Sequence, residues 1–303
     1  SSTLQATQIK TLSYGPDDTH VMDLYTPDIL PGKKIPAIVL AHGGLWQSGG
    51  RASLATLCKN IVAQSGNRIA CASIDYRLSQ DIGGECNGTG IDTYREQVRD
   101  MVQAYSLLQE NAAVHGIDPA QMFVGGHSAG GHLAQILNLR WSEFAQKCKT
   151  PEDCPAPRGA IGLEGIYDIP AWNDYDVNFW EGRFACATRK AFGSPGPTPP
   201  AAMDAGLQQR AWDAGSPTWL ANHPEILAVK PAGDVLLIHS TGDDWVDSAE
   251  ADTLGDALLK SFPQIKVTVK TDGSCAVGQH NDMLEEPELA DCISRFVMDN
   301  SSQ

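Results

Sequence analysis

Apolar positions along this chain follow two different periods. Short runs of strand length occur at residues 35–41, 68–76, 122–124, 159–166, 234–240 and 266–270. Longer segments with apolar positions at helical spacing occur at residues 51–63, 92–114, 132–137, 248–261 and 285–298. Residues 7–25 contain two alternating segments around Gly15-Pro16-Asp17-Asp18, which predicts an N-terminal β-hairpin.

Strands that alternate with helices predict an open, mainly parallel sheet with helices on both faces. We therefore expect an α/β fold in which residues 1–303 form a single domain. Residues 168–225 interrupt the alternation with an aromatic-rich segment that lacks a strand pattern. We interpret this segment as a cap over the edge of the sheet, whose aromatic side chains either line the substrate pocket or form a small core of their own. The candidates for the pocket are Trp172, Phe179 and Trp180.

The sequence Gly126-His127-Ser128-Ala129-Gly130 lies between a strand pattern and an apolar helical segment. Glycines two residues before and two residues after a serine at such a turn are typical of a nucleophile elbow. The serine backbone is strained there, and a Cβ on the neighbouring glycines would clash. The helix N-terminus favours developing negative charge on the substrate. We expect Ser128 to be a nucleophile, with His127 beside the substrate.

A serine nucleophile needs a base, and the base needs an orienting acid. Of the eight histidines, only His280 lies in a loop directly after the last predicted strand. Asp243 is the first carboxylate beyond the strand predicted at residues 234–240. Asp244 is the alternative acid, whereas Asp247 is better placed to cap the following helix. The order serine, aspartate, histidine along the chain fits this assignment.

An oxyanion hole is the third requirement of acyl transfer. The sequence His42-Gly43-Gly44 follows a buried strand pattern, where glycine amides can turn toward a substrate carbonyl. The residue after the nucleophile, Ala129, supplies another N–H. We expect Gly43, Gly44 and Ala129 to form the hole and Trp46 to pack on the acyl or alcohol part of the substrate.

Composition and charge narrow the classes of partner. The chain has 303 residues, 42% of them hydrophobic, and a net charge of -15. Such a charge argues against nucleic acid, since phosphate binding needs a basic surface. No apolar run approaches the roughly 18–20 residues of a membrane span. The absence of a C-x-x-C pair argues against a zinc-ribbon site and against a thioredoxin-like redox motif. We therefore expect neither a metal nor a cofactor.

Several of the eight cysteines lie in polar, loop-like contexts, which favours disulfides over buried thiols. Cys148 and Cys154 could close a small loop, and Cys275 and Cys292 could tie a loop to the last helix; the full pairing stays open. Glycosylation sequons lie at Asn87 and Asn300. Together these features lead us to expect a secreted protein.

The chain resembles the α/β-hydrolases, in the carboxylesterase branch that includes hormone-sensitive-lipase-like esterases and kynurenine formamidases. The motifs that carry the resemblance are His42–Trp46, Asp75–Leu78, Gly126–Gly130, Asp243-x-x-Val246 and His280. The first motif is most similar to kynurenine-formamidase-like and feruloyl-type esterases. The resemblance implies that the serine, aspartate and histidine named above form the triad, and that the three amides form the oxyanion hole.

These observations predict a secreted serine esterase that hydrolyses small-molecule carboxylic esters through an acyl-enzyme. An amide or formamide hydrolase with the same triad is the first alternative. A non-catalytic binding relative of the fold is the second. The acyl and alcohol groups of the substrate and the oligomeric state are left open by the sequence.

Overall fold

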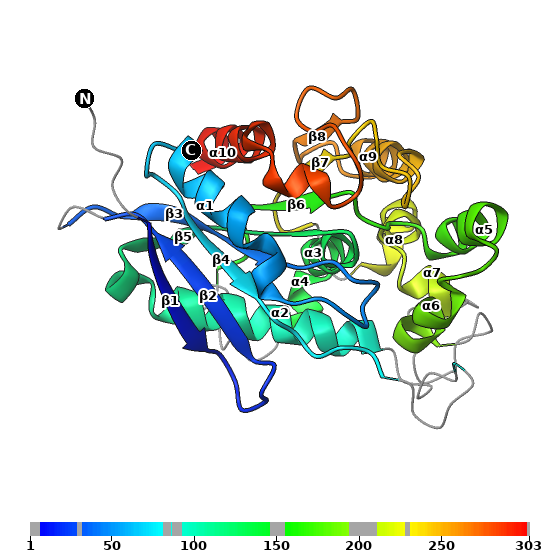
Figure 1. The fold of residues 1–303 in the computed structure, drawn as a ribbon, viewed down its shortest axis with the longest axis horizontal. Coiled ribbons are helices and arrows are strands. Elements are labelled where there is room, and N and C mark those ends of the chain that lie inside the picture. The colour runs from blue at the N-terminus through cyan, green and yellow to red at the C-terminus, as the bar shows by residue number, and fades with distance from the viewer. Residues whose placement is uncertain are drawn as a thin grey trace.

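The computed structural model describes residues 7–28, 32–80, 86, 93–145, 155–193, 211–227 and 231–301. In this part of the chain, eight strands form one sheet in the order β1-β2-β4-β3-β5-β6-β7-β8 (Figure 1). The strands are β1 (Gln8–Ser13), β2 (Val21–Thr26), β3 (Ile35–Ala41), β4 (Ala70–Ile74), β5 (Ile117–His127), β6 (Gly159–Leu163), β7 (Asp234–Ile238) and β8 (Val267–Lys270). β1 and β2 form the predicted antiparallel hairpin, β2 is antiparallel to β4, and all other pairs are parallel. The α/β prediction is confirmed.

Two hydrophobic clusters cover the two faces of the sheet. Along β3, Ala37, Val39 and Ala41 belong to one cluster, and Ile38 and Leu40 belong to the other. The cause is the period of two residues in a strand, which sends successive side chains to opposite faces. Because both faces are covered, this central strand is apolar throughout rather than alternating.

Helices pack on both sides of the sheet. α1 (Ala55–Gln64) and α10 (Pro287–Ser301) pack together on one face, and α2 (Thr93–Glu110), α3 (Ala129–Leu139) and α9 (Ala249–Ser261) cover the other. α4 (Trp141–Phe144) follows α3, and short 3₁₀ turns occur at η1 (Arg51–Leu54), η2 (Ala112–His115) and η5 (Asp282–Glu285).

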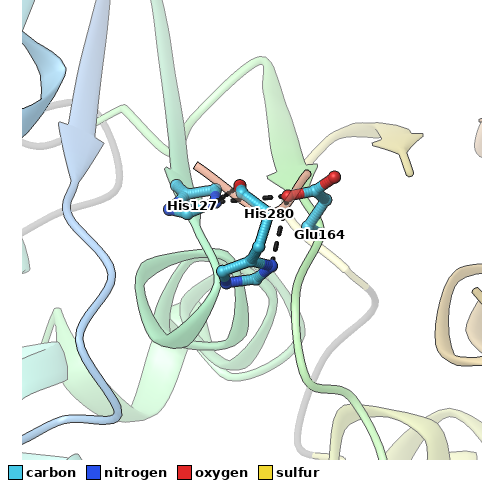
Figure 2. Close-up of side chains that lie close together, drawn as sticks. All are labelled: His127, Glu164 and His280. Carbon is cyan, nitrogen blue, oxygen red and sulfur yellow. Dashed lines mark hydrogen bonds and ion pairs between the residues drawn. The ribbon is translucent and has the colours of Figure 1, made fainter. Parts of the chain in front are cut away.

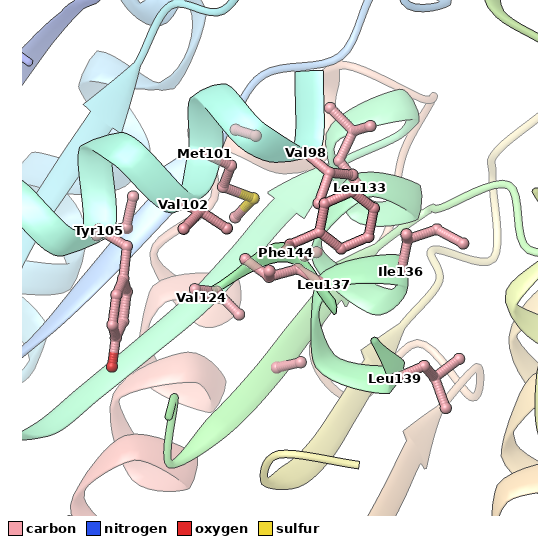
Figure 3. Close-up of a cluster of buried hydrophobic side chains, with 14 of the residues drawn as sticks. Val98, Met101, Val102, Tyr105, Val124, Leu133, Ile136, Leu137, Leu139 and Phe144 are labelled. Carbon is pink, nitrogen blue, oxygen red and sulfur yellow. The ribbon is translucent and has the colours of Figure 1, made fainter. Parts of the chain in front are cut away.

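The α2–α3 contact forms much of the core on its face of the sheet. The α2 residues in this contact recur at intervals of three and four positions, from Val98 to Tyr105, so they lie on one side of the helix. Figure 3 shows this cluster, with Val98, Met101, Val102 and Tyr105 of α2 near Leu133 and Leu137 of α3 and Val124 of β5. This packing fixes the position of α3, whose first residue follows Ser128.

The predicted cap contains helices and, in its described part, no sheet strand. Its elements are α5 (Ile169–Trp180), α6 (Ala185–Phe192), α7 (Ala211–Ala214), α8 (Pro217–Asn222) and η4 (Pro224–Ile226). They group at the end of the molecule opposite β1 and β2 (Figure 1). The segment connects β6 to β7, which are neighbours inside the sheet. The single-domain organisation stays a prediction.

Several element boundaries differ from the sequence prediction, and at Glu164 a single residue with positive φ is the cause. The helix expected to reach residue 114 ends at Glu110, and after a 3₁₀ turn Gly116 (φ 64°) redirects the chain directly into β5. The strand expected to reach residue 166 ends at Leu163, because Glu164 has φ 48°. A left-handed residue is incompatible with extended strand geometry.

Three disulfides link the described residues: Cys58–Cys71, Cys86–Cys186 and Cys275–Cys292. The last of these ties a loop to α10, as predicted. Cys148 and Cys154 lie outside the described residues.

One of the two sequons is inaccessible in this fold. Asn300 is buried in α10, where its side-chain amide donates to the Phe296 carbonyl at 2.8 Å. Asn87 lies outside the described residues. Among the helices that the structure describes, none combines the length and apolar character needed to cross a membrane.

Candidate active site

Ser128 occupies a sharp turn between β5 and α3. Its backbone has φ 54° and ψ −120°, outside the regions that L-residues favour. The Ser128 N–H donates to the Leu163 carbonyl at 2.8 Å, which holds the turn against the neighbouring strand β6. Strain of this kind persists where the surroundings over-determine the conformation, and it is the backbone expected of a nucleophile elbow.

The glycines around Ser128 are required by close backbone packing. A Cβ on Gly130 would lie 2.1 Å from the Ala41 carbonyl oxygen, and a Cβ on Gly126 would lie 2.6 Å from the same oxygen. α3 therefore starts directly against the end of β3. A larger residue at either position would push the helix away and move Ser128.

His280 lies between β8 and α10, and its imidazole meets the loop that follows β7. Its Nδ1 is 2.9 Å from Oδ2 of Asp243. Both side chains are almost completely buried. Asp244 and Asp247 are exposed, and Asp247 accepts the Ala249 N–H at the start of α9, one residue before the N-cap Ser248. The geometry brings together the predicted histidine and aspartate, although their catalytic roles stay predictions.

A second histidine contacts Asp243. His239, at the end of β7, has its Nε2 3.1 Å from Oδ2 of Asp243 and 3.0 Å from the Val246 carbonyl. The backbone N–H groups of Trp245 and Val246 donate to the other carboxylate oxygen. Burial alone would raise the pKa of Asp243, but the hydrogen bonds from His239 and His280 outweigh it and hold that pKa below its usual range. Asp243 is therefore fixed and ionised.

Glu164 is a second carboxylate beside His280, and it is not among the site residues predicted from the sequence. Its Oε2 lies 3.2 Å from Nδ1 of His280 and 3.4 Å from Nε2 of His127, as Figure 2 shows. Burial would raise the pKa of Glu164, but the two histidines outweigh it and lower the pKa. Burial also opposes a charged His280, but Asp243 and Glu164 outweigh it and raise the pKa of His280 to about 9.

His127, Glu164 and His280 are spaced like metal ligands, with one ligand atom of each within 4.8 Å of the others. Their atoms are already engaged within the chain, however. His127 Nε2 donates to the backbone carbonyl of His280 at 2.8 Å, and His280 Nδ1 faces the two carboxylates. We interpret the cluster as a hydrogen-bond network around His280, and we assign no metal site to it.

The loop after β3 brings Gly43 against Ser128. A Cβ on Gly43 would lie 3.0 Å from the Ser128 Cβ, so only glycine allows this approach. Tyr76 supports the loop, because its hydroxyl donates to the His42 carbonyl at 2.8 Å and its ring stacks on the His42 imidazole. The segment 75–78 is thus the structural support of this loop.

Ala129 is the first residue of α3, so its N–H has no partner within the helix. Gly43 and Gly44 line the same cavity as Ser128. The three residues predicted for the oxyanion hole therefore meet around the serine.

A cavity of about 210 Å³ opens above Ser128 and His280. Its aromatic wall consists of Trp172 from α5, Phe184 before α6 and Trp245 after β7. The rings are stacked in sequence, with centroids 6.0 Å apart from Trp172 to Phe184 and 6.0 Å apart from Phe184 to Trp245. Of the three, only Trp172 is among the predicted pocket residues. Nothing in the local sequence of Phe184 and Trp245 distinguishes them from the remaining aromatic residues.

The other predicted substrate-binding residues have different surroundings. His127 lines the cavity. Trp46 is fully buried away from it, with its indole N–H donating to Nδ1 of His132 at 3.2 Å and its ring against Phe192, so it has no face free for a substrate. Phe179 is 69% exposed, and neither it nor Trp180 is among the residues that line the cavity.

Comparison with known proteins identifies the family. The model of the BD-FAE family matches residues 22–177, which include the glycine loop after β3, Ser128 and Glu164. The chain belongs to the BD-FAE family. The matched part ends before Asp243 and His280.

Curated relatives include esterases and one hydrolase named for formamides. Esterase LipQ of Mycobacterium tuberculosis is 28% identical over 166 residues, which cover 54% of this chain and 37% of LipQ. The kynurenine formamidase-like hydrolase fscH of Fusarium equiseti is 24% identical over 241 residues, which cover 73% of this chain and 69% of fscH. The chain spans only 36–37% of the length of the first three curated relatives it matches.

Solved structures share the fold. Carboxyl esterase 2 from the mycorrhizal fungus Tuber melanosporum superposes with a TM-score of 0.64 at 22% identity, covering 99% of this chain and 88% of that one. Together with the mainly parallel sheet and the elbow, this likeness identifies the fold as that of an α/β-hydrolase of the carboxylesterase type.

Proposed function

We propose that the chain is a serine hydrolase of carboxylic esters, with Ser128 as nucleophile, His280 as base and Asp243 as orienting acid. The observation that supports this most strongly is the shared cavity of Ser128 and His280, combined with the 2.9 Å contact of His280 Nδ1 with Asp243. This contact holds the proton on Nδ1 and leaves Nε2 to accept the serine proton.

In the proposed reaction, Ser128 Oγ attacks the ester carbonyl while His280 Nε2 takes the hydroxyl proton. The N–H groups of Gly43, Gly44 and Ala129 stabilise the oxyanion, each contributing about 2.7–4 kcal/mol to the transition state. The C–O bond to the alcohol breaks, and the imidazolium gives its proton to the leaving oxygen. Water then hydrolyses the acyl-enzyme by the reverse proton transfers.

The substrate in this proposal contacts His127 and the aromatic wall of Trp172, Phe184 and Trp245. A cavity of about 210 Å³ is at the small end for a ligand site, which favours a small acyl or alcohol group inside it and the rest of the substrate outside. The surface of the cavity is mostly apolar, which suits an uncharged ester group.

Cleavage of an amide or formamide by the same triad is the second candidate. It is favoured by the likeness to a relative named as kynurenine formamidase-like, which this chain matches over more of its length than it matches LipQ. The chemistry differs only in the leaving group that His280 protonates.

We also propose that the protein works outside the cytosol, as a secreted protein. The three disulfides support this, because such bonds persist in oxidising compartments.

Hydrolysis of p-nitrophenyl acetate and of N-formylkynurenine tests the proposal. We expect turnover of the first with a kcat/KM well above that for the second, and the reverse ranking would favour the formamidase alternative. A fluorophosphonate should label the parent chain but not Ser128→Ala. A folded parent chain that is neither labelled nor active would be a binding relative of the fold.

A further inference from the structure

Two carboxylates, and not one, face the Nδ1 of His280. Asp243 Oδ2 is 2.9 Å away and Glu164 Oε2 is 3.2 Å away. Asp243 comes from the loop after β7, and Glu164 is the first residue after β6, so neighbouring strands deliver the two groups to one nitrogen. A catalytic triad needs only one acid at this position.

A glutamate at position 164 is energetically unfavourable for the fold. Its side chain is completely buried, and its backbone has φ 48°, a left-handed conformation that is unfavourable for residues other than glycine. A buried carboxylate also loses its hydration and needs compensating partners. The described partners are the Ser240 N–H at 3.3 Å, Nε2 of His127 and the imidazole of His280. Of these, His280 is the one that gains a charge in the proposed reaction.

We propose that Glu164 is a second positioning residue for His280, sharing with Asp243 both the Nδ1 hydrogen and the positive charge that forms when His280 takes the Ser128 proton. This inference rests on the proposed function, and it deepens that function by adding a fourth residue to the triad. Glu164 touches neither the substrate nor the serine in this role and acts only through His280.

The groups around His280 come from three strand ends. His127 lies at the end of β5, with its ring centroid 4.6 Å from that of His280. Glu164 follows β6. Asp243 follows β7 and also contacts His239. Burial lowers the pKa of His127, so it adds no positive charge beside His280 at neutral pH. The two carboxylates are therefore the anions that set the proton affinity of His280.

Titration of the His280 imidazole by ¹⁵N NMR tests the proposal without any turnover. Glu164→Gln keeps the shape and an acceptor for Ser240 but removes the charge. We expect the pKa of His280 to fall by about one or more, a tenfold or greater loss of proton affinity, since an opposite charge this close shifts a pKa by about 1–3. Glu250→Gln is the control, because Glu250 is also buried but its carboxyl group accepts the backbone N–H groups of Tyr167 and Asp168, directly before α5.

An unchanged titration in Glu164→Gln, or an equal shift in the Glu250 control, overturns the proposal. If Glu164→Gln does not fold, as judged by near-UV circular dichroism, Glu164→Asp replaces it. The shorter side chain withdraws the carboxylate by one methylene, so we expect a smaller fall in the pKa of His280. No fall in a folded Glu164→Asp likewise overturns the proposal.

A double-mutant cycle in kcat measures the shared role. In a triad with one acid, the Asp→Asn change costs about 10⁴-fold in kcat. Here we expect Asp243→Asn to cost at least about tenfold less than that, and the Asp243→Asn/Glu164→Gln variant to lose at least a further tenfold. Equal activity of the single and double variants overturns the proposal. If the parent chain hydrolyses no ester at all, the proposed function fails, whereas the NMR titration still decides whether Glu164 governs the His280 proton.

Discussion

The indole of Trp245 is stacked on the imidazole of His280. The ring centroids are 5.4 Å apart and the planes differ by 13°. Trp245 is 40% exposed, so it forms the outer wall between the imidazole and solvent. Its backbone N–H also donates to Asp243, which links the wall to the acid that holds His280. The position of one surface ring is thus coupled to the orientation of the proposed base.

Removal of the Trp245 ring should lower kcat/KM more than it lowers the stability of the fold. We expect Trp245→Ala to lower kcat/KM for p-nitrophenyl acetate by about tenfold, or ~1.4 kcal/mol, because aromatic stacking is worth about 0.5–1.5 kcal/mol and water gains access to the imidazole. Trp245→Phe should retain most of the activity. Phe179→Ala removes another exposed ring that does not line the cavity and serves as the control. Equal losses in the two alanine variants would contradict the assigned role.

The kcat/KM of this protein should reach its maximum at a more alkaline pH than is usual for a serine hydrolase. His280 must be neutral to accept the Ser128 proton, and the two carboxylates raise its pKa to about 9. The neutral fraction therefore grows as the pH rises toward that value, and kcat/KM should increase about tenfold per pH unit well below it. Steady-state kinetics between pH 6 and pH 10 check this. A plateau already reached at pH 7 would show that the imidazole is not held as a cation in the free protein.

The Cys275–Cys292 disulfide should matter for activity beyond its effect on stability. Cys275 lies in the loop that carries His280, and Cys292 lies in α10. Loops of this length give a stabilisation of about 3 kcal/mol, so replacing both cysteines by alanine should lower the free energy of unfolding by roughly that amount. We also expect kcat to fall several-fold, since the loop is freed at its anchor.

The Cys58–Cys71 pair provides a matched control for this prediction. Its sequence separation is 13 residues, against 17 for the first pair, but it joins α1 to β4 and does not anchor the loop that carries His280. The corresponding double alanine variant should lose comparable stability in urea unfolding and keep its kcat under native conditions. A similar fall in kcat in both variants would argue against a specific role of the loop anchor.

Glu250 should make the protein less stable as the pH rises. It is fully buried, and burial raises its pKa to about 8, although the N–H groups of Tyr167 and Asp168 partly offset this. The folded state thus keeps a proton on Glu250 that the unfolded chain releases near pH 4.5. The contribution of Glu250 to stability is therefore greatest below pH 4.5, and it falls as the pH rises to about 8. Glu250→Gln keeps both hydrogen bonds and cannot ionise. Urea unfolding should show equal stability at pH 4 and a gain on the order of a few kcal/mol at pH 8; a constant difference would refute the argument.

Much of the fold follows from the sequence because its causes are local. The period of two residues in β1 and β2, the continuous apolar run of β3 and the helical spacing in α2 each reflect which faces of an element are covered. The elbow is local as well, since Gly126 and Gly130 are needed by a turn that spans only a few residues. For the same reason the insertion after β6 was recognisable by its lack of a strand pattern.

The assignment of His280 and Asp243 rested on chain order, and the structure adds the contact between them. Glu164 could have been noticed as a charged residue near the end of an otherwise apolar run, between Gly162 and Gly165. Its proximity to His280 could not have been noticed, because the two residues are far apart in the chain. They meet only when β6, β7 and β8 lie side by side in the sheet.

The sequence by itself determined the α/β elements, the strained serine and the glycine loop beside it, because backbone geometry and binary pattern are written in neighbouring residues. Only the tertiary structure decided that Trp46 is buried, that Phe184 and Trp245 form the cavity wall, and that a second carboxylate reaches His280. These features depend on which side chains from separate strands and helices come within a few ångströms of one another, and that is set by the packing of the whole sheet.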